Sequence, residues 1–212
     1  MITVHHLLVS QSERVIWLLE ELGLRYELKS YPRTAQGLAD PVFLQLHPLG
    51  NAPVIQDGDV TMAESSAIFT YILDLYGNGK LSIAPGQPGY ADFTYWFNYP
   101  NAGLMPQAMH HLFDTMAGDN SSMRATMMRD RLTRHLGMID DRLAKVPYLA
   151  GADFTAADIL AHFPFGTMSI FAPLDIGGYP HIRAWLDRIS ARPTYQKAMQ
   201  LAGHDKDPVP QT

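Results

Sequence analysis

The pattern of hydrophobic and polar positions changes character about a third of the way along the chain. Residues 2–9 (ITVHHLLV) form a short apolar run that predicts a strand. Within residues 15–22, apolar side chains recur at intervals of three and four, which predicts one buried helix face, and Gly23 is placed to end that helix. The chain therefore opens with a strand followed by a helix.

The rest of this first region continues in short elements. Gly58 and Asp59 predict the tight turn of a hairpin. The further elements expected here are a strand at 26–30, a helical turn at 41–46, the two hairpin strands at 52–57 and 60–62, and a helix at 65–76. The predicted order is β-α-β-α-β-β-α, which is an α/β arrangement.

Beyond a segment rich in glycine and proline, GNGKLSIAPGQPG at residues 77–89, strand signals vanish. Pro106 predicts a break within the first of the helices that follow. These helices are expected at 90–117, 123–146, 156–168, 180–192 and 194–202. We therefore predict an α/β domain over 1–77, a linker over 78–88 and an all-α helical-bundle domain over 89–212.

Composition narrows the class of protein. The 212 residues carry a net charge of −5, so no basic surplus exists to neutralise the phosphates of a nucleic acid. The absence of cysteine excludes disulfides, thiolate metal sites and cysteine nucleophiles. The sequence has neither a signal peptide pattern nor an apolar run long enough to span a membrane. We expect a soluble cytoplasmic protein that binds neither nucleic acid nor membrane.

The first candidate for chemistry is the segment SQSER at residues 10–14, between the first strand and the first helix. Ser10 and Glu13 fit a capping box, in which the hydroxyl only satisfies a helix N–H. The same hydroxyl, in the positive field of a helix N-terminus, is also suited to donate a hydrogen bond to a thiolate and lower the pKa of the thiol. Ser12 is an alternative candidate for that role.

Two further segments allow both a structural and a functional interpretation. Pro53 and Val54 predict either an ordinary edge-strand start or a cis-proline that presents the Val54 backbone to a peptide-like ligand. Glu64 and Ser65 predict either a helix cap, with Ser65 as the capping residue, or a pocket that holds an ammonium and a carboxylate of one ligand.

A fourth segment, FTAADI at residues 154–159, has only a structural interpretation. Thr155 and Asp158 predict a capping box, with Phe154 and Ile159 as its hydrophobic staple. It is expected to open a helix of the second domain.

Together, these segments resemble the cytosolic glutathione transferases. The resemblance rests on the βαβαββα half with its APV and ESS segments, the linker, and the helical half with its FTAAD box. The segment from Ser10 to Leu22 is especially similar to bacterial and fungal members with a serine in the catalytic position, and NAGLMP at 101–106 is similar to the first helix of their second domain. The resemblance implies a thioredoxin-like first domain.

It also implies roles for single residues. Ser10 would stabilise the thiolate of glutathione, with Ser12 beside it, and Pro53 would be cis. Val54 would bind the cysteinyl backbone, while Glu64 and Ser65 would hold the γ-glutamyl end. Asn51 stands where many members have a longer side chain near the glycyl carboxylate, and His47 and Gln36 are the alternatives.

The second-substrate pocket is expected in the helical domain. Adjacent histidines on a helix point about 100° apart, so His110 and His111 do not predict a metal site, but one of them is a candidate to face the pocket. The residues near the place where the family puts this pocket are Tyr95, Phe97, Tyr99, Met105, Met109 and His110.

The resemblance implies a homodimeric glutathione transferase of detoxification. It would bind glutathione as a co-substrate, hold no permanent cofactor, and conjugate the thiolate to a small hydrophobic electrophile. The alternatives are a glutathione-dependent isomerase, dehalogenase or peroxidase on the same scaffold, or a non-catalytic transferase-like protein that acts through protein partners.

Overall fold

The fold comes from a computed structural model that describes residues 1–118 and 121–203. They form two compact units, which are treated one at a time below. The first unit contains Met1–Lys80 together with the described residues from Ser190 onward, and the second contains Leu81–Ile189.

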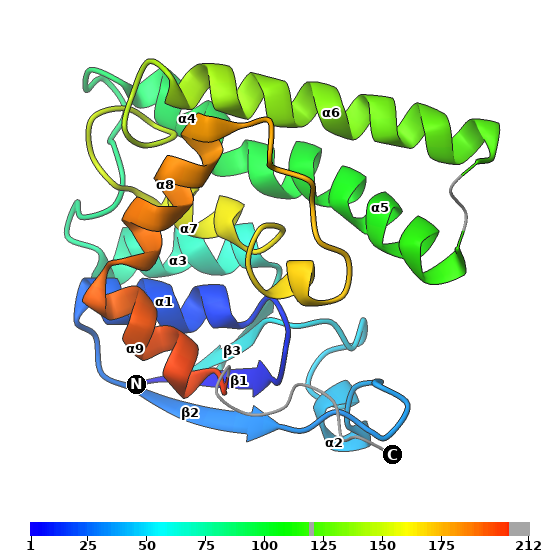
Figure 1. The fold of residues 1–212 in the computed structure, drawn as a ribbon. Coiled ribbons are helices and arrows are strands. Elements are labelled where there is room, and N and C mark those ends of the chain that lie inside the picture. Colours follow the sequence, from blue (N-terminus) through cyan, green and yellow to red (C-terminus); the bar gives the residue numbers. More distant parts are fainter. Residues whose placement is uncertain (119–120, 204–212) are drawn as a thin grey trace. The chain divides into compact units, whose positions relative to one another are not determined.

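The first unit is an α/β unit whose elements occur in the predicted order (Figure 1). The βαβαββα prediction is confirmed, with differences of a few residues at element ends. The elements are β1 (Ile2–Leu7), α1 (Glu13–Leu22), β2 (Tyr26–Tyr31), α2 (Pro41–Leu44), β3 (Val54–Asp57), β4 (Val60–Ala63), α3 (Ser65–Tyr76) and α9 (Pro193–Leu201).

The sheet has the strand order β2-β1-β3-β4. Strand β2 is parallel to β1, whereas β3 is antiparallel to β1 and β4 is antiparallel to β3. Val54 at the start of β3 lies opposite His5 on β1 and Ala63 on β4. The carboxyl ends of β1 and β4 therefore meet the amino end of β3 at one edge of the sheet.

Each strand of this sheet places successive side chains on opposite faces. On one face, Leu7 of β1 and Val54 of β3 pack against Phe43 of α2. On the opposite face of β1, His6 points toward the start of α1, where its ring contacts Ser12. Helices α1 and α3 both lie on one side of the sheet (Figure 1). Because β1 is buried on both faces, a polar side chain on it needs a partner.

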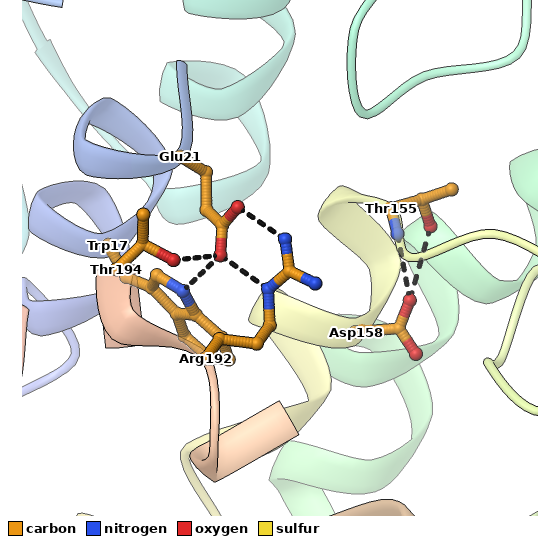
Figure 2. Close-up of polar contacts among 6 residues, drawn as sticks. All are labelled: Trp17, Glu21, Thr155, Asp158, Arg192 and Thr194. Carbon is orange, nitrogen blue, oxygen red and sulfur yellow. Dashed lines mark hydrogen bonds and ion pairs between the residues drawn. The ribbon is translucent and has the colours of Figure 1, made fainter. Parts of the chain in front are cut away.

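The C-terminal helix α9 packs against α1 through a cluster of polar and aromatic contacts. The Glu21 carboxylate accepts two hydrogen bonds of 2.6 Å from the Arg192 guanidinium and further bonds from Thr194 and Trp17 (Figure 2). Trp17 also meets Tyr195 edge to face, with ring centroids 4.9 Å apart. This helix was expected in the helical domain, whereas its contacts place it in the first unit.

The second unit is helical in all its regular elements among residues 81–118 and 121–189. Helices α5 and α6 lie side by side (Figure 1). The elements are α4 (Tyr90–Tyr99), a π-helical segment (Pro100–Leu104), α5 (Met105–Ala117), α6 (Met123–Leu143), α7 (Ala156–His162), a 3₁₀ turn (Thr167–Ile170) and α8 (Pro180–Ser190).

The predicted break at Pro106 is wrong in position. The irregularity comes earlier, as the π-helical segment that begins at Pro100, and Pro106 lies in the first turn of α5. The π-helical segment runs directly into α5, so the missing N–H of Pro106 falls immediately after that segment ends. Extra residues inserted as a π-bulge are a known cause of an irregular helix.

The predicted capping box at Thr155 is confirmed, and its acidic partner does more than cap. Asp158 is buried and accepts from the backbone N–H of Thr155 at 3.0 Å (Figure 2). It also accepts from the Leu149 N–H and from Trp185 Nε1, both at 2.9 Å. Burial raises the pKa of Asp158 to about 6 against the opposing effect of these hydrogen bonds. Asp158 thus connects α7, α8 and the loop before them.

Among the described residues, no helix combines the length and the apolar character that crossing a bilayer requires.

Candidate functional site

Three chain segments singled out in the sequence meet at one edge of the sheet in the first unit. Leu7, Val54 and Ala63 belong to the same buried cluster, so the ends of β1 and β4 and the start of β3 are in contact. The chain runs on from Leu7 to Ser10, enters β3 through Pro53, and leaves β4 into Glu64. This edge is the candidate site.

Two helices also begin at this edge. Helix α1 starts at Glu13, three residues beyond Ser10, and α3 starts at Ser65, directly after β4. The first backbone N–H groups of a helix have no partner within the helix, and the helix dipole makes this end positive. The site therefore favours a ligand with anionic groups.

Ser10 does not cap α1, so the capping-box prediction for Ser10 and Glu13 is wrong. Ser12 occupies the N-cap position and has helical backbone angles, and the Ser10 hydroxyl instead donates to the Leu7 carbonyl at 2.7 Å. Ser10 Oγ also accepts from the Ser12 N–H at 3.3 Å. The turn between β1 and α1 is too tight for the S-x-x-E geometry, and Ser10 is directed back toward the end of β1.

Ser12, the alternative candidate, lies next to Ser10 and is more deeply buried. Its hydroxyl oxygen is 2.8 Å from Ser10 Oγ and 2.7 Å from His6 Nδ1, and the side chains of Ser12 and His6 have no exposed surface. His6 was not predicted as a site residue. The strand period would have found it, because His6 lies on the face of β1 opposite to Leu7.

The backbone before Ser10 is strained, which the sequence also did not reveal. Val9 has a φ of 53°, a left-handed conformation that is rare and costly for a β-branched residue. Arg33, which follows β2, donates to the carbonyls of Leu8 and Val9 at 2.9 and 2.8 Å. These two bonds clamp the strained turn that carries Ser10.

A buried charged pair follows the serines on α1. Burial lowers the pKa of Arg14 to about 9, while the neighbouring Glu13 carboxylate opposes this shift. The Arg14 guanidinium donates at 2.9 Å to Oε1 of Gln11, which lies between the two serines in the turn before the helix. The start of α1 is thus fixed from both sides of Ser12.

The segment that enters β3 has the predicted backbone. The Ala52–Pro53 peptide bond is cis, as expected, and Val54 is buried as the first residue of β3. Asn51 is exposed just before it. Half-buried His47 accepts from the Leu49 N–H at 3.4 Å, within its own turn. The contact of one of these side chains, or of exposed Gln36, with a glycyl carboxylate stays a prediction.

Glu64 and Ser65 lie where β4 passes into α3. The N-cap position belongs to Glu64, which makes no side-chain capping bond, so the prediction that Ser65 caps the helix is wrong. Glu64 is exposed and has a φ of 70°, another rare conformation for a residue with a side chain, whereas Ser65 is buried. Such outliers persist where the surrounding fold enforces them, often at ligand sites.

The residues predicted for a second-substrate pocket lie in the second unit, in different surroundings. Met105 and Met109 pack in one apolar cluster with Ala108, Phe163 and Met168, whereas Phe97 is buried against Phe93. His110 is exposed, and His111 Nε2 lies 3.2 Å from the Pro173 carbonyl oxygen.

Tyr95 is half exposed and belongs to another place on this unit. It stacks on Tyr99 with ring centroids 5.7 Å apart, and Tyr99 in turn contacts His135 Nδ1 at 2.6 Å. Tyr95 also lines a shallow groove of about 630 Å³ between α4 and α6. Of the predicted pocket residues, the second unit brings together Met105 and Met109 but not Tyr95 or Phe97.

The sequence matches two family descriptions, "Glutathione S-transferase, N-terminal domain" over residues 1–74 and "Glutathione S-transferase, C-terminal domain" over residues 104–193. Glutathione S-transferase 3 of Schizosaccharomyces pombe is 32% identical over 94% of this chain and 87% of its own length. Glutathione S-transferase 3 of Zea mays is 29% identical over 88% of this chain and 87% of its own length.

A crystal structure of a glutathione S-transferase from Actinobacillus pleuropneumoniae is similar in fold. It is 31% identical and superposes with a TM-score of 0.86 over 96% of this chain and 93% of that one. The superposition therefore includes both the α/β unit and the helical unit of the present chain. The thioredoxin-like prediction for the first unit agrees with this neighbour, and the chain belongs to the glutathione S-transferase family.

Proposed function

We propose that this protein binds glutathione at the sheet edge of its first unit and conjugates the glutathione thiolate to small hydrophobic electrophiles. The observation that carries the proposal is that the segments leading to Ser10, Val54 and Ser65 meet at one edge, where two helices begin. Glutathione is a tripeptide with two carboxylates, an ammonium group and a thiol. Positive helix ends, an accessible acidic side chain and a hydroxyl donor complement those groups.

In this assignment the N-terminus of α3 and Ser65 bind the γ-glutamyl carboxylate, and exposed Glu64 pairs with its ammonium group. The Val54 backbone binds the cysteinyl unit, and Asn51 or His47 approaches the glycyl carboxylate. Each contact is of the charge-assisted or backbone type that fixes a peptide-like ligand in one orientation.

Ser10 supplies the chemical step. Its hydroxyl donates a hydrogen bond to the sulfur and stabilises the thiolate relative to the thiol, which lowers the pKa of the bound thiol. Lowering a thiol pKa by one unit is worth about 1.4 kcal/mol. Binding also orients the sulfur toward its acceptor, which contributes further to the rate.

We further propose that the helical domain supplies the acceptor site, with Met105 and Met109 among its apolar side chains. Methionine repacks easily and suits acceptors of varied shape, such as aryl halides, epoxides or peroxides. A homodimer and a cytoplasmic detoxifying role complete the proposal, on the strength of the family alone. The oligomeric state is testable by light scattering of the purified protein.

Calorimetric titration with glutathione tests the central claim. We expect binding in the micromolar to millimolar range, and equal binding of S-methylglutathione shows that recognition does not depend on the thiol proton. No heat of binding at millimolar glutathione would overturn the proposed function. A panel of electrophiles, with a peroxide and an isomerisable substrate included, then separates conjugation from peroxidase or isomerase activity.

A further inference from the structure

A continuous chain of short hydrogen bonds runs from Ser10 into the interior of the first unit. Ser10 Oγ lies 2.8 Å from Ser12 Oγ, which lies 2.7 Å from Nδ1 of His6. On the other side of the ring, His6 Nε2 lies 3.0 Å from the carbonyl oxygen of Ala202, at the end of α9. The side chains of Ser12 and His6 are both fully buried.

The chemistry of its two ends gives the chain a direction. A carbonyl oxygen accepts hydrogen bonds and never donates, so His6 Nε2 carries a proton and donates it to Ala202. In the neutral imidazole, Nδ1 is then an acceptor, and the Ser12 hydroxyl donates to it. Because Ser12 gives its proton to His6, a proton between the two serines can come only from Ser10. The Ser10 hydroxyl has two acceptors within reach, the Leu7 carbonyl at 2.7 Å and Ser12 Oγ at 2.8 Å, and it must turn from the first to the second for the transfer. The chain thus runs Ser10 to Ser12 to His6.

This direction leaves a place for one more donor. When Ser10 donates to Ser12, one lone pair of Ser10 Oγ accepts from the Ser12 N–H at 3.3 Å, and the other is available to accept from a group at the sheet edge. The thiol of glutathione would lie there under the proposed function, on which the following inference rests. A thiol that donates to Ser10 Oγ would extend the chain to four groups, which end in a basic imidazole.

We propose that His6 accepts the proton of the glutathione thiol through Ser12 and Ser10. The sulfur–hydrogen bond breaks as the proton passes to Ser10 Oγ, the Ser10 proton passes to Ser12 Oγ, and the Ser12 proton passes to His6 Nδ1. The products are a thiolate and an imidazolium, so charge and protons balance. His6 is a positioning residue and proton store, since it touches the reacting sulfur only through the serines.

The transfer reverses the hydrogen bonds between Ser10, Ser12 and His6 Nδ1. The imidazolium Nδ1 now donates to Ser12, Ser12 donates to Ser10, and Ser10 donates to the thiolate, while Nε2 still donates to Ala202. Ser10 therefore becomes the thiolate-stabilising donor as a direct result of the transfer. When the sulfur has attacked its acceptor, the stored proton returns along the chain to solvent or to the leaving group.

The decisive measurement follows the His6 ring nitrogens by heteronuclear NMR of the whole protein, with the signal assigned from the His6→Asn variant. Saturating glutathione at neutral pH is expected to protonate Nδ1. S-methylglutathione has no thiol proton and should leave Nδ1 an acceptor. If glutathione binds as a thiolate, seen by its ultraviolet absorbance, while His6 stays neutral, the relay is overturned.

Two variants test the chain by its effect on the thiol. The amide oxygen of Asn in His6→Asn can still accept from Ser12 but cannot take up a proton, and Ser12→Ala interrupts the chain without touching the ring. Each should reduce the thiolate fraction of bound glutathione at neutral pH about tenfold, which corresponds to about one unit in thiol pKa. Unchanged thiolate in both variants overturns the relay even if one of them folds poorly.

His5→Asn is the matched control. His5 is also a buried histidine of β1, but it points to the other face, where it contacts Tyr31 and Gln56 at 2.8 and 3.0 Å. This variant should leave the thiolate fraction unchanged. Affinity for S-methylglutathione separates the two proposals, because its absence in the wild-type protein overturns the proposed function, whereas normal affinity with an unchanged thiolate fraction overturns the relay alone.

Discussion

The two units of this protein satisfy their buried polar groups in different ways. In the first unit, Ser10, Ser12 and His6 are joined through hydroxyl groups and a ring nitrogen, each of which can either donate or accept. In the second unit, Asp158 is held by three N–H groups, which can only donate, and by a longer bond of 3.4 Å from the Thr155 hydroxyl. The first network can reverse direction by moving protons alone once the Ser10 hydroxyl faces Ser12, whereas the backbone and indole N–H groups around Asp158 cannot reverse. A network of hydroxyl groups can therefore transfer a proton, whereas N–H donors around a carboxylate hold neighbouring elements in one arrangement.

The largest effect is expected where the fixed network is broken. Asp158→Ala leaves buried donors of Thr155, Leu149 and Trp185 without an acceptor, so we expect a loss of about 4 kcal/mol in the free energy of unfolding. Chemical denaturation measures this loss, and hydrogen exchange of α7 and α8 locates it.

Asp158→Asn is the matched variant, because it keeps one acceptor oxygen without the charge. The pKa of Asp158 is raised to about 6, so folding favours its protonated form. The stabilisation linked to this proton is full below the unfolded pKa near 3.8 and is lost as the pH rises through about 6. The Asn variant should lack this pH dependence and lose less stability than the Ala variant. Equal losses in both would show that the fixed donors are not the cause.

The next largest effect is expected from removing the Ser10 hydroxyl, which begins the network of Ser10, Ser12 and His6. Ser10→Ala should lower kcat/KM for conjugation by about 10²-fold or more, the usual cost of one donor aimed at a developing or resident anion. Steady-state kinetics measure it, and the affinity for S-methylglutathione checks that the site is intact. Unchanged turnover would transfer the role to Ser12 or to backbone N–H groups.

A smaller effect is expected at the joint between α1 and α9, which is polar but fixed. Burial alone would raise the pKa of Glu21, but hydrogen bonds from Arg192, Thr194 and Trp17 outweigh it and hold the pKa below its usual value. Its stabilisation is therefore full above the unfolded value of 4.5 and is lost as the pH falls through the folded value.

Glu21→Gln should cost about 2 kcal/mol of unfolding free energy at neutral pH and remove that acid sensitivity. Urea denaturation at several pH values measures both. Glu20→Gln is the comparison variant. Glu20 pairs with exposed Lys197 at 2.7 Å, a contact worth about 1 kcal/mol or less, and its bond from the Tyr26 hydroxyl at 2.8 Å can also be accepted by the Gln amide oxygen. A larger loss in the comparison variant than in Glu21→Gln would contradict the assignment.

The smallest effect is expected at the surface of the helical unit. His110→Ala should change the free energy of unfolding by about 0.5 kcal/mol or less, because His110 is exposed. Glutathione affinity should stay the same, while KM for the electrophile changes if His110 faces the acceptor. Kinetics with glutathione held at saturation separate these effects, and an altered glutathione affinity would contradict the division of roles.

Much of the first unit was predictable because its elements are short and are marked by turn residues. The strand period, Gly58-Asp59 and the PV and ES segments placed the sheet and its turns within a few residues. The cap at Ser10 was not predictable, because it depends on how tightly the chain turns after β1. The Arg33 clamp gave no local signal at all, since it joins residues about 25 apart.

The helical unit was predictable in its elements but not in its surroundings. Helical periodicity found α4 to α8, yet it shows only that Phe97 and Tyr95 point in different directions, not what lies there. The π-helical segment at Pro100 also escaped, because a proline signals a helix irregularity without fixing which residue absorbs it. A pocket made of several helix faces depends on packing between residues far apart in sequence.

The contact between His6 and the Ala202 carbonyl joins residues 196 positions apart. During synthesis, the carbonyl that fixes the His6 tautomer is made 196 residues after His6, long after Ser10 and Pro53. At about 5–20 residues per second, the first strand waits some 10–40 s for that partner. Until Ala202 is made, His6 lacks the carbonyl to which its Nε2 donates. Truncation before α9 would likewise leave Ser10 and Ser12 in the chain but remove the acceptor that fixes the His6 tautomer.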